Sequence, residues 1–67
     1  MRILIVSHIA NKMILKESNA IPTIGSKVDA FYIPYPVVKD LLFYPDEKTL
    51  RGTGYANANI DVMVYVN

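Results

Sequence analysis

The chain of 67 residues contains no cysteine and only one histidine, His8. Without cysteine the chain has no disulfide framework and no thiolate nucleophile, and a single histidine is too few for a Cys/His zinc site. Any acid–base scheme would have to centre on His8, because histidine is the side chain that ordinarily titrates near neutral pH. Its neighbour Ser7 should point to the opposite face of a strand and so should not meet it. We therefore predict no enzymatic activity, no metal site and no cofactor.

Charge is also sparse. Charged residues make up 19% of the chain and the net charge is +1, whereas about 25% of an average soluble domain is charged. No run of basic residues is present to neutralise a phosphate backbone, so nucleic-acid binding is not favoured. The longest apolar runs, such as residues 3–6, are far shorter than the ~20 residues of a membrane span, and no signal-peptide cleavage pattern follows them. A cytoplasmic protein without a membrane partner is expected.

Apolar side chains, in contrast, make up 52% of the chain. We expect a single small domain over residues 1–67, because a chain of this length cannot build two cores. A domain of this size buries only about 60% of the surface of its unfolded chain, so a monomer would leave apolar surface in contact with water. With disulfides and metals excluded, association remains as a source of stability. We therefore expect a homo-oligomer or a complex with a protein partner.

The first half of the chain contains short runs rich in β-branched and aromatic residues. Residues 2–9 and 13–17 predict a hairpin whose turn lies at residues 11–12. Residues 18–26 carry turn chemistry and are expected to form a loop. Residues 27–33 predict a third strand, which the following prolines would end.

The second half is expected to contain two more strands and a helical turn. Residues 37–44 favour a strand, although their spacing leaves open an α+β alternative in which they form a helix. Residues 45–51 predict one helical turn that ends at Gly52. Apolar residues then alternate with more polar ones from residue 60 to residue 67, which predicts a strand with one buried face. The residues of that predicted buried face are Ile60, Val62, Val64 and Val66.

The predicted order is four strands, a helical turn and a fifth strand. This order is the layout of a small barrel of the Src-homology-3 type. We therefore predict a mainly β fold, namely a five-stranded Src-homology-3-like barrel with one short helical turn before the last strand.

Tyrosine and proline are concentrated in the middle of the chain, where Tyr32, Pro34, Tyr35, Pro36 and Tyr44 are candidate partner-binding residues. Tyrosine supplies a large contact area at a small entropy cost, and proline stiffens the backbone before binding. Two other interpretations stay open. The rings can fill the core while the prolines protect the end of a strand, or the segment can line a small-molecule pocket.

One part of the chain resembles a known group of proteins. The stretch from residues 21–28 through Tyr44 and Pro45 is similar to short, uncharacterised proteins encoded by phages of Gram-positive bacteria. The stretch contains no functional motif, so no site residue follows from the resemblance. The resemblance implies an accessory role in the host cytoplasm, such as binding and inhibiting a host protein.

We predict a non-enzymatic protein-binding module that modulates its partner by occupying a surface. One alternative is a small barrel that binds single-stranded nucleic acid by stacking bases on exposed tyrosines, which the balanced charge disfavours. Another is an oligomer that binds a small ligand in a pocket between subunits.

Overall fold

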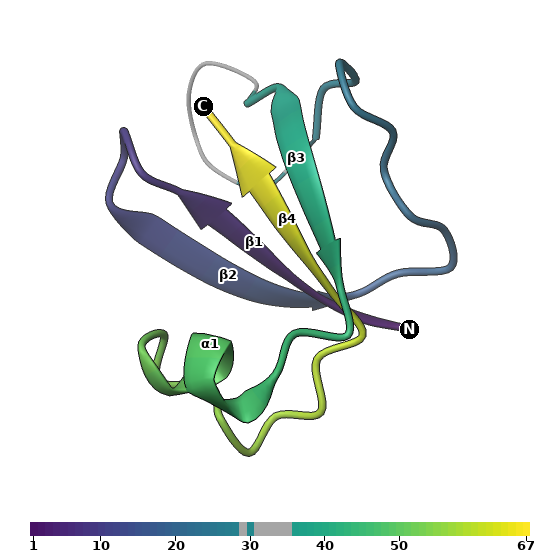
Figure 1. The fold of residues 1–67 in the computed structure, drawn as a ribbon. Helices are drawn as coiled ribbons and strands as arrows, with labels where there is room; N and C mark the ends of the chain where they lie inside the picture. The colour runs from purple at the N-terminus through teal and green to yellow at the C-terminus, as the bar shows by residue number, and fades with distance from the viewer. Residues whose placement is uncertain (29, 31–35) are drawn as a thin grey trace.

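The computed structural model describes residues 1–28, 30 and 36–67, shown in Figure 1. The elements in this part of the chain are β1 (Arg2–Ser7), β2 (Lys12–Glu17), β3 (Val38–Phe43), α1 (Glu47–Arg51) and β4 (Val62–Val66). The prediction of a mainly β fold with one short helix is confirmed. Within the same residues, no helix has the length and apolar character needed to cross a bilayer.

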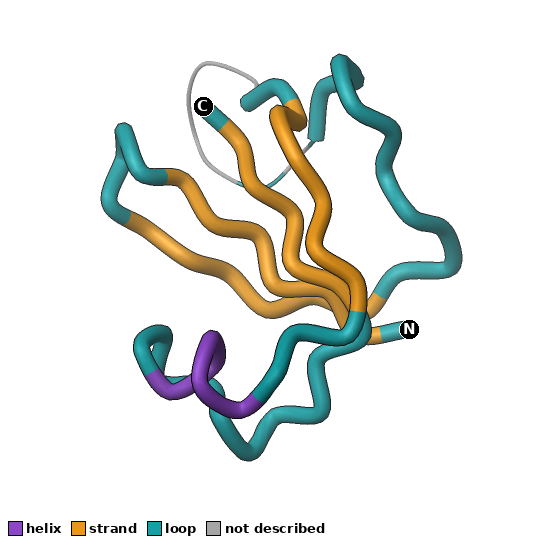
Figure 2. Tube along the Cα trace, in the orientation of Figure 1, coloured by secondary structure: helices purple, strands orange, loops and turns teal. Residues whose placement is uncertain are grey.

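The four strands form one mixed sheet in the order β2-β1-β4-β3 (Figure 2). β1 is antiparallel to β2, β3 is antiparallel to β4, and the central strands β1 and β4 run parallel to each other. β2 and β3 therefore lie at opposite edges and do not pair. The sheet is open, so these strands do not form the predicted five-stranded barrel. The reason is the parallel pairing of the first and last strands, which places both in the centre of the sheet.

The two central strands are buried on both faces. On β4, Met63 is 2% exposed and its neighbour Val64 is 0% exposed, although the two side chains point to opposite faces. Parallel strands with both faces covered are typically near-continuous apolar runs, and this is the pattern of both β1 and β4. The prediction of one buried face on the last strand is therefore wrong.

The sheet separates two apolar clusters. The segment that follows β2 contributes Val28 and Ala30 to the first face, and α1 contributes Leu50 to the second face. Ile60 lies before β4 and packs in the second cluster with Leu50, so its predicted place beside Val62 is wrong. The buried residues are Ile3, Ile5, Val38, Val62, Val64 and Val66 on the first face, and Leu4, Val6, Leu50, Ile60 and Met63 on the second.

The predicted hairpin is confirmed. β1 and β2 pair from Arg2 opposite Glu17 to Ser7 opposite Lys12. The turn therefore spans residues 8–11 and begins earlier than expected. Asn11 closes it with φ of 53°, a conformation that asparagine tolerates better than most residues.

The predicted third strand, residues 27–33, is described only in part. Lys27 forms an isolated antiparallel bridge with Val37. Residues 29 and 31–33 of that predicted strand lie outside the described residues. Residues 25–28 lie beside residues 36–38 and form a short two-stranded ribbon at the start of β3. In this ribbon the Val38 N–H donates to the Ser26 carbonyl at 2.9 Å.

Both predictions for residues 37–51 hold. Residues 38–43 form β3, so the helical alternative for this segment is wrong. The helix α1 begins after Asp46, whose carboxylate accepts a hydrogen bond from the Thr49 N–H at 2.7 Å, and it ends at Gly52. Aspartate at this position satisfies a backbone donor that the first turn of a helix leaves without a partner.

Candidate functional site

The structure describes two of the five candidate partner-binding residues, Pro36 and Tyr44. Tyr32, Pro34 and Tyr35 lie outside the described residues. Pro36 is buried, and its carbonyl accepts a hydrogen bond from the Val28 N–H at 2.9 Å. Pro36 therefore belongs to the ribbon beside β3 and offers little surface to a partner. Tyr44, in contrast, is 78% exposed.

Tyr44 is the tip of an exposed apolar corner at the end of β3. We call Leu42, Phe43 and Tyr44 the β3 corner; their side chains are 38%, 50% and 78% exposed. Phe43 lies opposite Val62 and so projects from the first face of the sheet, whereas Leu42 lies opposite Met63 and projects from the second. The β3 corner thus presents apolar side chains on both faces of an edge strand.

Sequence reasoning found only Tyr44 of these three residues. The missed signal is the unbroken apolar run Leu41-Leu42-Phe43-Tyr44 before a proline. In an edge strand, consecutive apolar residues cannot all face one core, because successive side chains point to opposite faces. Only the tertiary structure shows that β3 is an edge strand.

The backbone of Tyr44 is held in an unusual conformation. Its φ is 49°, and its N–H donates to the Asp61 carbonyl at 2.8 Å. This hydrogen bond continues the pairing of β3 with β4 by one residue, because Phe43 lies opposite Val62. The next residue, Pro45, disfavours the right-handed helical region for the residue before it.

A tyrosine is poorly suited to this backbone. Asn11 and Asn59 are the other non-glycine residues with positive φ in the described part of the chain, and asparagine enters this region more readily than tyrosine does. The left-handed region costs an ordinary L-residue about 1–2 kcal/mol. Since the Tyr44 ring is largely exposed, it does not offset this cost by filling a core. Strained residues of this kind cluster at binding and active sites.

The outer backbone of β3 is largely occupied. The ribbon at Ser26 covers Val38, and the Asp40 carboxylate accepts a hydrogen bond from the Leu41 N–H at 2.8 Å. A bulge also interrupts the strand between Val38 and Asp40. Charges and bulges of this kind protect edge strands from pairing with another strand. These features disfavour strand addition along the first part of β3.

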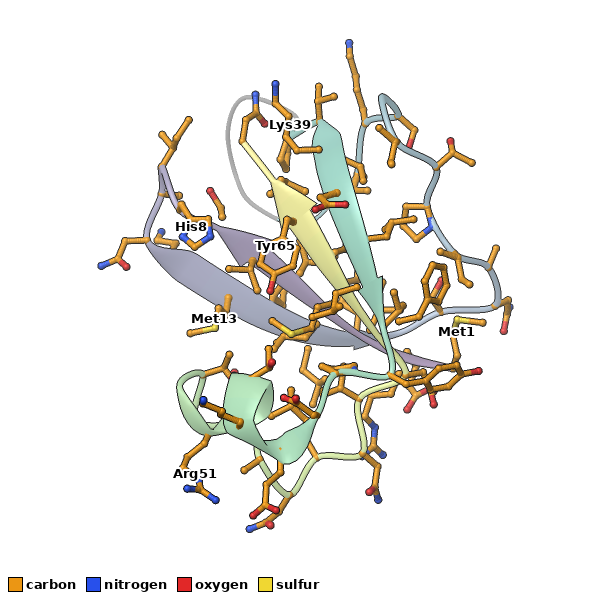
Figure 3. All side chains as sticks on the ribbon, in the orientation of Figure 1. Met1, His8, Met13, Lys39, Arg51 and Tyr65 are labelled. Atoms are coloured by element: carbon orange, nitrogen blue, oxygen red, sulfur yellow. The ribbon has the colours of Figure 1, made fainter. Side chains whose placement is uncertain are left out.

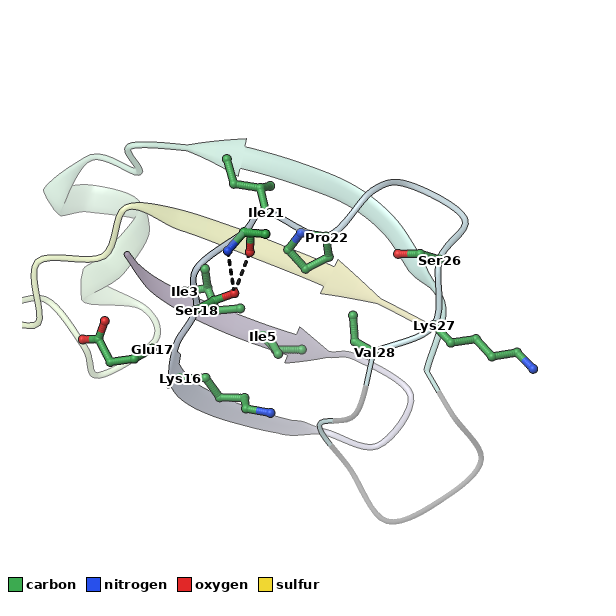
Figure 4. Close-up of a pocket in the computed structure, with 11 residues that line it drawn as sticks. Ile3, Ile5, Lys16, Glu17, Ser18, Ile21, Pro22, Ser26, Lys27 and Val28 are labelled. Atoms are coloured by element: carbon green, nitrogen blue, oxygen red, sulfur yellow. Dashed lines mark hydrogen bonds between the residues drawn. The ribbon is translucent and has the colours of Figure 1, made fainter.

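The first face of the sheet carries a pocket of about 300 Å³ (Figure 4). The Ser18 hydroxyl donates to the Ala20 carbonyl at 2.6 Å and holds the turn that leads into Ile21 and Pro22 above the sheet. The walls are mostly apolar, with Ile3, Ile5 and Val28 among them. This volume is at the lower end of ligand-binding pockets, which span about 300–1,000 Å³.

A second pocket, of about 270 Å³, lies on the other face between the hairpin turn and α1. It contains His8, whose ring stacks on that of Tyr65 with centroids 6.0 Å apart (Figure 3). Ser7 is buried, and its hydroxyl donates to the Asn67 carbonyl at 2.9 Å and accepts from the Ala10 N–H at 3.1 Å. Its hydroxyl is thus engaged by the backbone. Ser7 therefore does not form a nucleophile–base pair with His8.

The described residues hold no group of three or more histidine, aspartate or glutamate side chains that fits a metal ion. At Asp46, the hydrogen bond from the Thr49 backbone N–H lowers the pKa of the carboxyl below its ordinary value. This change reflects helix capping.

Comparison of the chain with family models, curated proteins and solved structures finds no match.

Proposed function

We propose that this protein is a non-enzymatic binding module that docks on a protein partner through the β3 corner. The observation that carries the proposal is Tyr44, an exposed aromatic residue held at φ of 49° where glycine would be less strained. Leu42 and Phe43 widen the apolar contact on either side of it. Aromatic anchors of this kind dominate the energy of protein interfaces.

The partner surface that fits the β3 corner is an apolar cleft with a hydrogen-bonding group at its base. The Tyr44 ring would enter the cleft, and its hydroxyl would keep a polar partner there. Leu42 and Phe43 project from opposite faces of the edge and would contact the two rims. The resemblance to phage proteins extends the proposal to a partner in the bacterial host, which the docked module would inhibit by covering that cleft.

Site-specific photo-crosslinking in living cells tests this proposal. Benzoyl-phenylalanine would replace Tyr44 in one variant and Ile9 in a matched control, because Ile9 is also highly exposed but lies in the hairpin turn. We expect a protein to be crosslinked from position 44 and not from position 9, and its yield to fall when Phe43→Ser is added. No crosslink from position 44, or identical products from both positions, would overturn the proposal.

A further inference from the structure

The hydrogen bonds at the start of the hairpin show which backbone groups of β2 face outward. The Ser18 N–H donates to the Met1 carbonyl, and the Met1 nitrogen donates to the Ser18 carbonyl, both at 2.8 Å. This exchange makes Met1 and Ser18 a hydrogen-bonded pair. Such pairs alternate along an antiparallel ladder, so the peptide groups of Met13, Leu15 and Glu17 point away from β1.

Among the described residues, no strand pairs with the outer edge of β2. β2 is the first strand in the sheet order and pairs with β1 alone. In the described part of the chain, the outward backbone groups of Met13, Leu15 and Glu17 have no hydrogen-bond partner. The strand also has no bulge and no proline. β2 thus has neither the bulge nor the covering segment found on β3, although Lys12, Lys16 and Glu17 are charged. The unpaired backbone groups of such an edge strand are a template for strand addition.

We propose that β2 pairs with β2 of a second copy of this chain. The two strands run antiparallel, with Leu15 opposite Leu15 of the second copy, and the two sheets become one. In this register Met13 lies opposite Glu17, Ile14 opposite Lys16, and Lys12 opposite Ser18 of the second copy.

The charge pattern of β2 is compatible with a second copy as the occupant and favours this register over its two neighbours. Outward peptide groups must meet outward peptide groups, so the strand can slide only in steps of two residues. A step in one direction places Lys12 opposite Lys16 of the second copy. A step in the other places Lys16 opposite Lys16. Like charges directly opposite each other destabilise a sheet, whereas the proposed register opposes no two charges of the same sign.

The proposed contact leaves the β3 corner accessible. β2 and β3 lie at opposite edges of the sheet (Figure 2), so a dimer formed at β2 presents one β3 corner at each end. Pairing along a six-residue strand buries less area than a standard interface of about 1,600 Å². A weak dimer with a micromolar dissociation constant is therefore expected.

Cysteine crosslinking tests both the contact and its register. The chain has no cysteine, so a variant with one introduced cysteine can form disulfides only between copies. In the proposed register residues 13 and 17 of different copies lie about 5.5 Å apart at Cα, within disulfide reach. Two copies of residue 13 lie four residues apart along the strands, or about 13 Å, which is beyond reach.

We therefore expect Met13→Cys and Glu17→Cys to form a mixed disulfide when the folded variants are combined with oxidised glutathione. Each variant alone should form little disulfide. The same mixture in urea is the control, and it should give all three pairings without preference. Absence of the mixed disulfide, or homodisulfides of equal yield in the folded state, would overturn the proposal.

Charge variants at position 13 give a second measurement. Met13→Glu places two carboxylates opposite each other, once at each end of the contact, whereas Met13→Lys places lysine opposite Glu17 of the second copy. By sedimentation equilibrium, we expect the dimer of Met13→Glu to have a dissociation constant about three- to tenfold higher than that of the wild type. The dissociation constant of Met13→Lys should stay close to that of the wild type. Circular dichroism confirms that each variant is folded. Equal effects of the two variants, or a wild type that keeps its 7.5 kDa mass at high micromolar concentration, would contradict the proposal.

Discussion

At the scale of single residues, Tyr44 combines an unfavourable backbone with an exposed ring. Replacing it with glycine should relieve the backbone without opening a cavity. We expect Tyr44→Gly to raise the free energy of unfolding by about 0.5–1 kcal/mol, which is the relief of the left-handed strain less the extra entropy of glycine in the unfolded chain. Urea denaturation measures this change.

The matched control for this prediction is Tyr44→Ala. Alanine keeps the Cβ atom that causes the strain, so it should give no gain in stability. Both variants should bind the partner identified by photo-crosslinking more weakly than the wild type does, since both lack the ring. If alanine stabilises the fold as much as glycine does, the strain at position 44 is not the cause.

Met63 illustrates why the burial of a single residue depends on its strand's place in the sheet. Its side chain is 2% exposed in the second apolar cluster, so Met63→Asp should abolish folding just as Val64→Asp should. The total stability of a small domain is about 5 kcal/mol. Burying a carboxylate without a partner costs more free energy than this. Far-ultraviolet circular dichroism reports the loss of the sheet.

The control is Leu42→Asp on the neighbouring strand. Leu42 lies opposite Met63 but is 38% exposed, so its carboxylate can reach water and the fold should survive. A folded Met63→Asp protein would show that the second face of β4 is not covered.

At the scale of elements, Asp46 makes the stability of the start of α1 depend on pH. The hydrogen bond from the Thr49 N–H holds the pKa of its carboxyl below the ordinary value. The stabilisation is therefore complete at neutral pH and is lost as the pH falls through the lowered pKa of the folded state. We expect the Thr49 amide resonance in NMR spectra to shift over this acidic range.

Asp46→Asn provides the control for this titration. Asparagine caps a helix about as well as aspartate does but does not titrate. The shift of the Thr49 resonance should therefore disappear while α1 remains formed. A Thr49 resonance that still moves with pH in this variant would assign the titration to another group.

Ser7 connects two elements that are distant in sequence. Its buried hydroxyl donates to the Asn67 carbonyl after β4 and accepts from the Ala10 N–H in the hairpin turn. Ser7→Ala leaves both groups without this partner, and we expect it to lower the free energy of unfolding by about 1–3 kcal/mol. Thermal denaturation measures the loss. Ser18→Ala is the control, because its hydrogen bonds lie in an exposed turn; an equal loss there would contradict the expectation.

At the scale of the whole molecule, the proposed dimer predicts stability that depends on concentration. A contact made by folded chains and not by unfolded ones raises the apparent stability by mass action. The midpoint of urea denaturation should therefore rise with protein concentration for the wild type and rise less for Met13→Glu. A midpoint that is independent of concentration for both proteins would argue against self-association.

Local signals in the sequence determined much of this fold. Runs rich in β-branched residues predicted the hairpin, and an alternating pattern predicted the last strand. The composition of residues 45–51 and Gly52 predicted the helical turn. These signals act over a few residues, because they depend on backbone preference and on the facing of neighbouring side chains. Tyr44 was predicted as a partner-binding residue with a core position left open, and it is exposed. Of the other four residues of the predicted site, Pro36 is buried and three lie outside the described part.

Only the tertiary structure decided which strands pair across long stretches of sequence. β1 and β4 pair in parallel, with Ile5 opposite Val64, and no local pattern encodes a contact between residues so far apart in the chain. That pairing covers both faces of the central strands, leaves β2 and β3 as edges, and turns the end of β3 into an exposed corner. The amino-acid pattern specifies which residues are apolar, whereas burial depends on which surfaces meet when distant segments pack together.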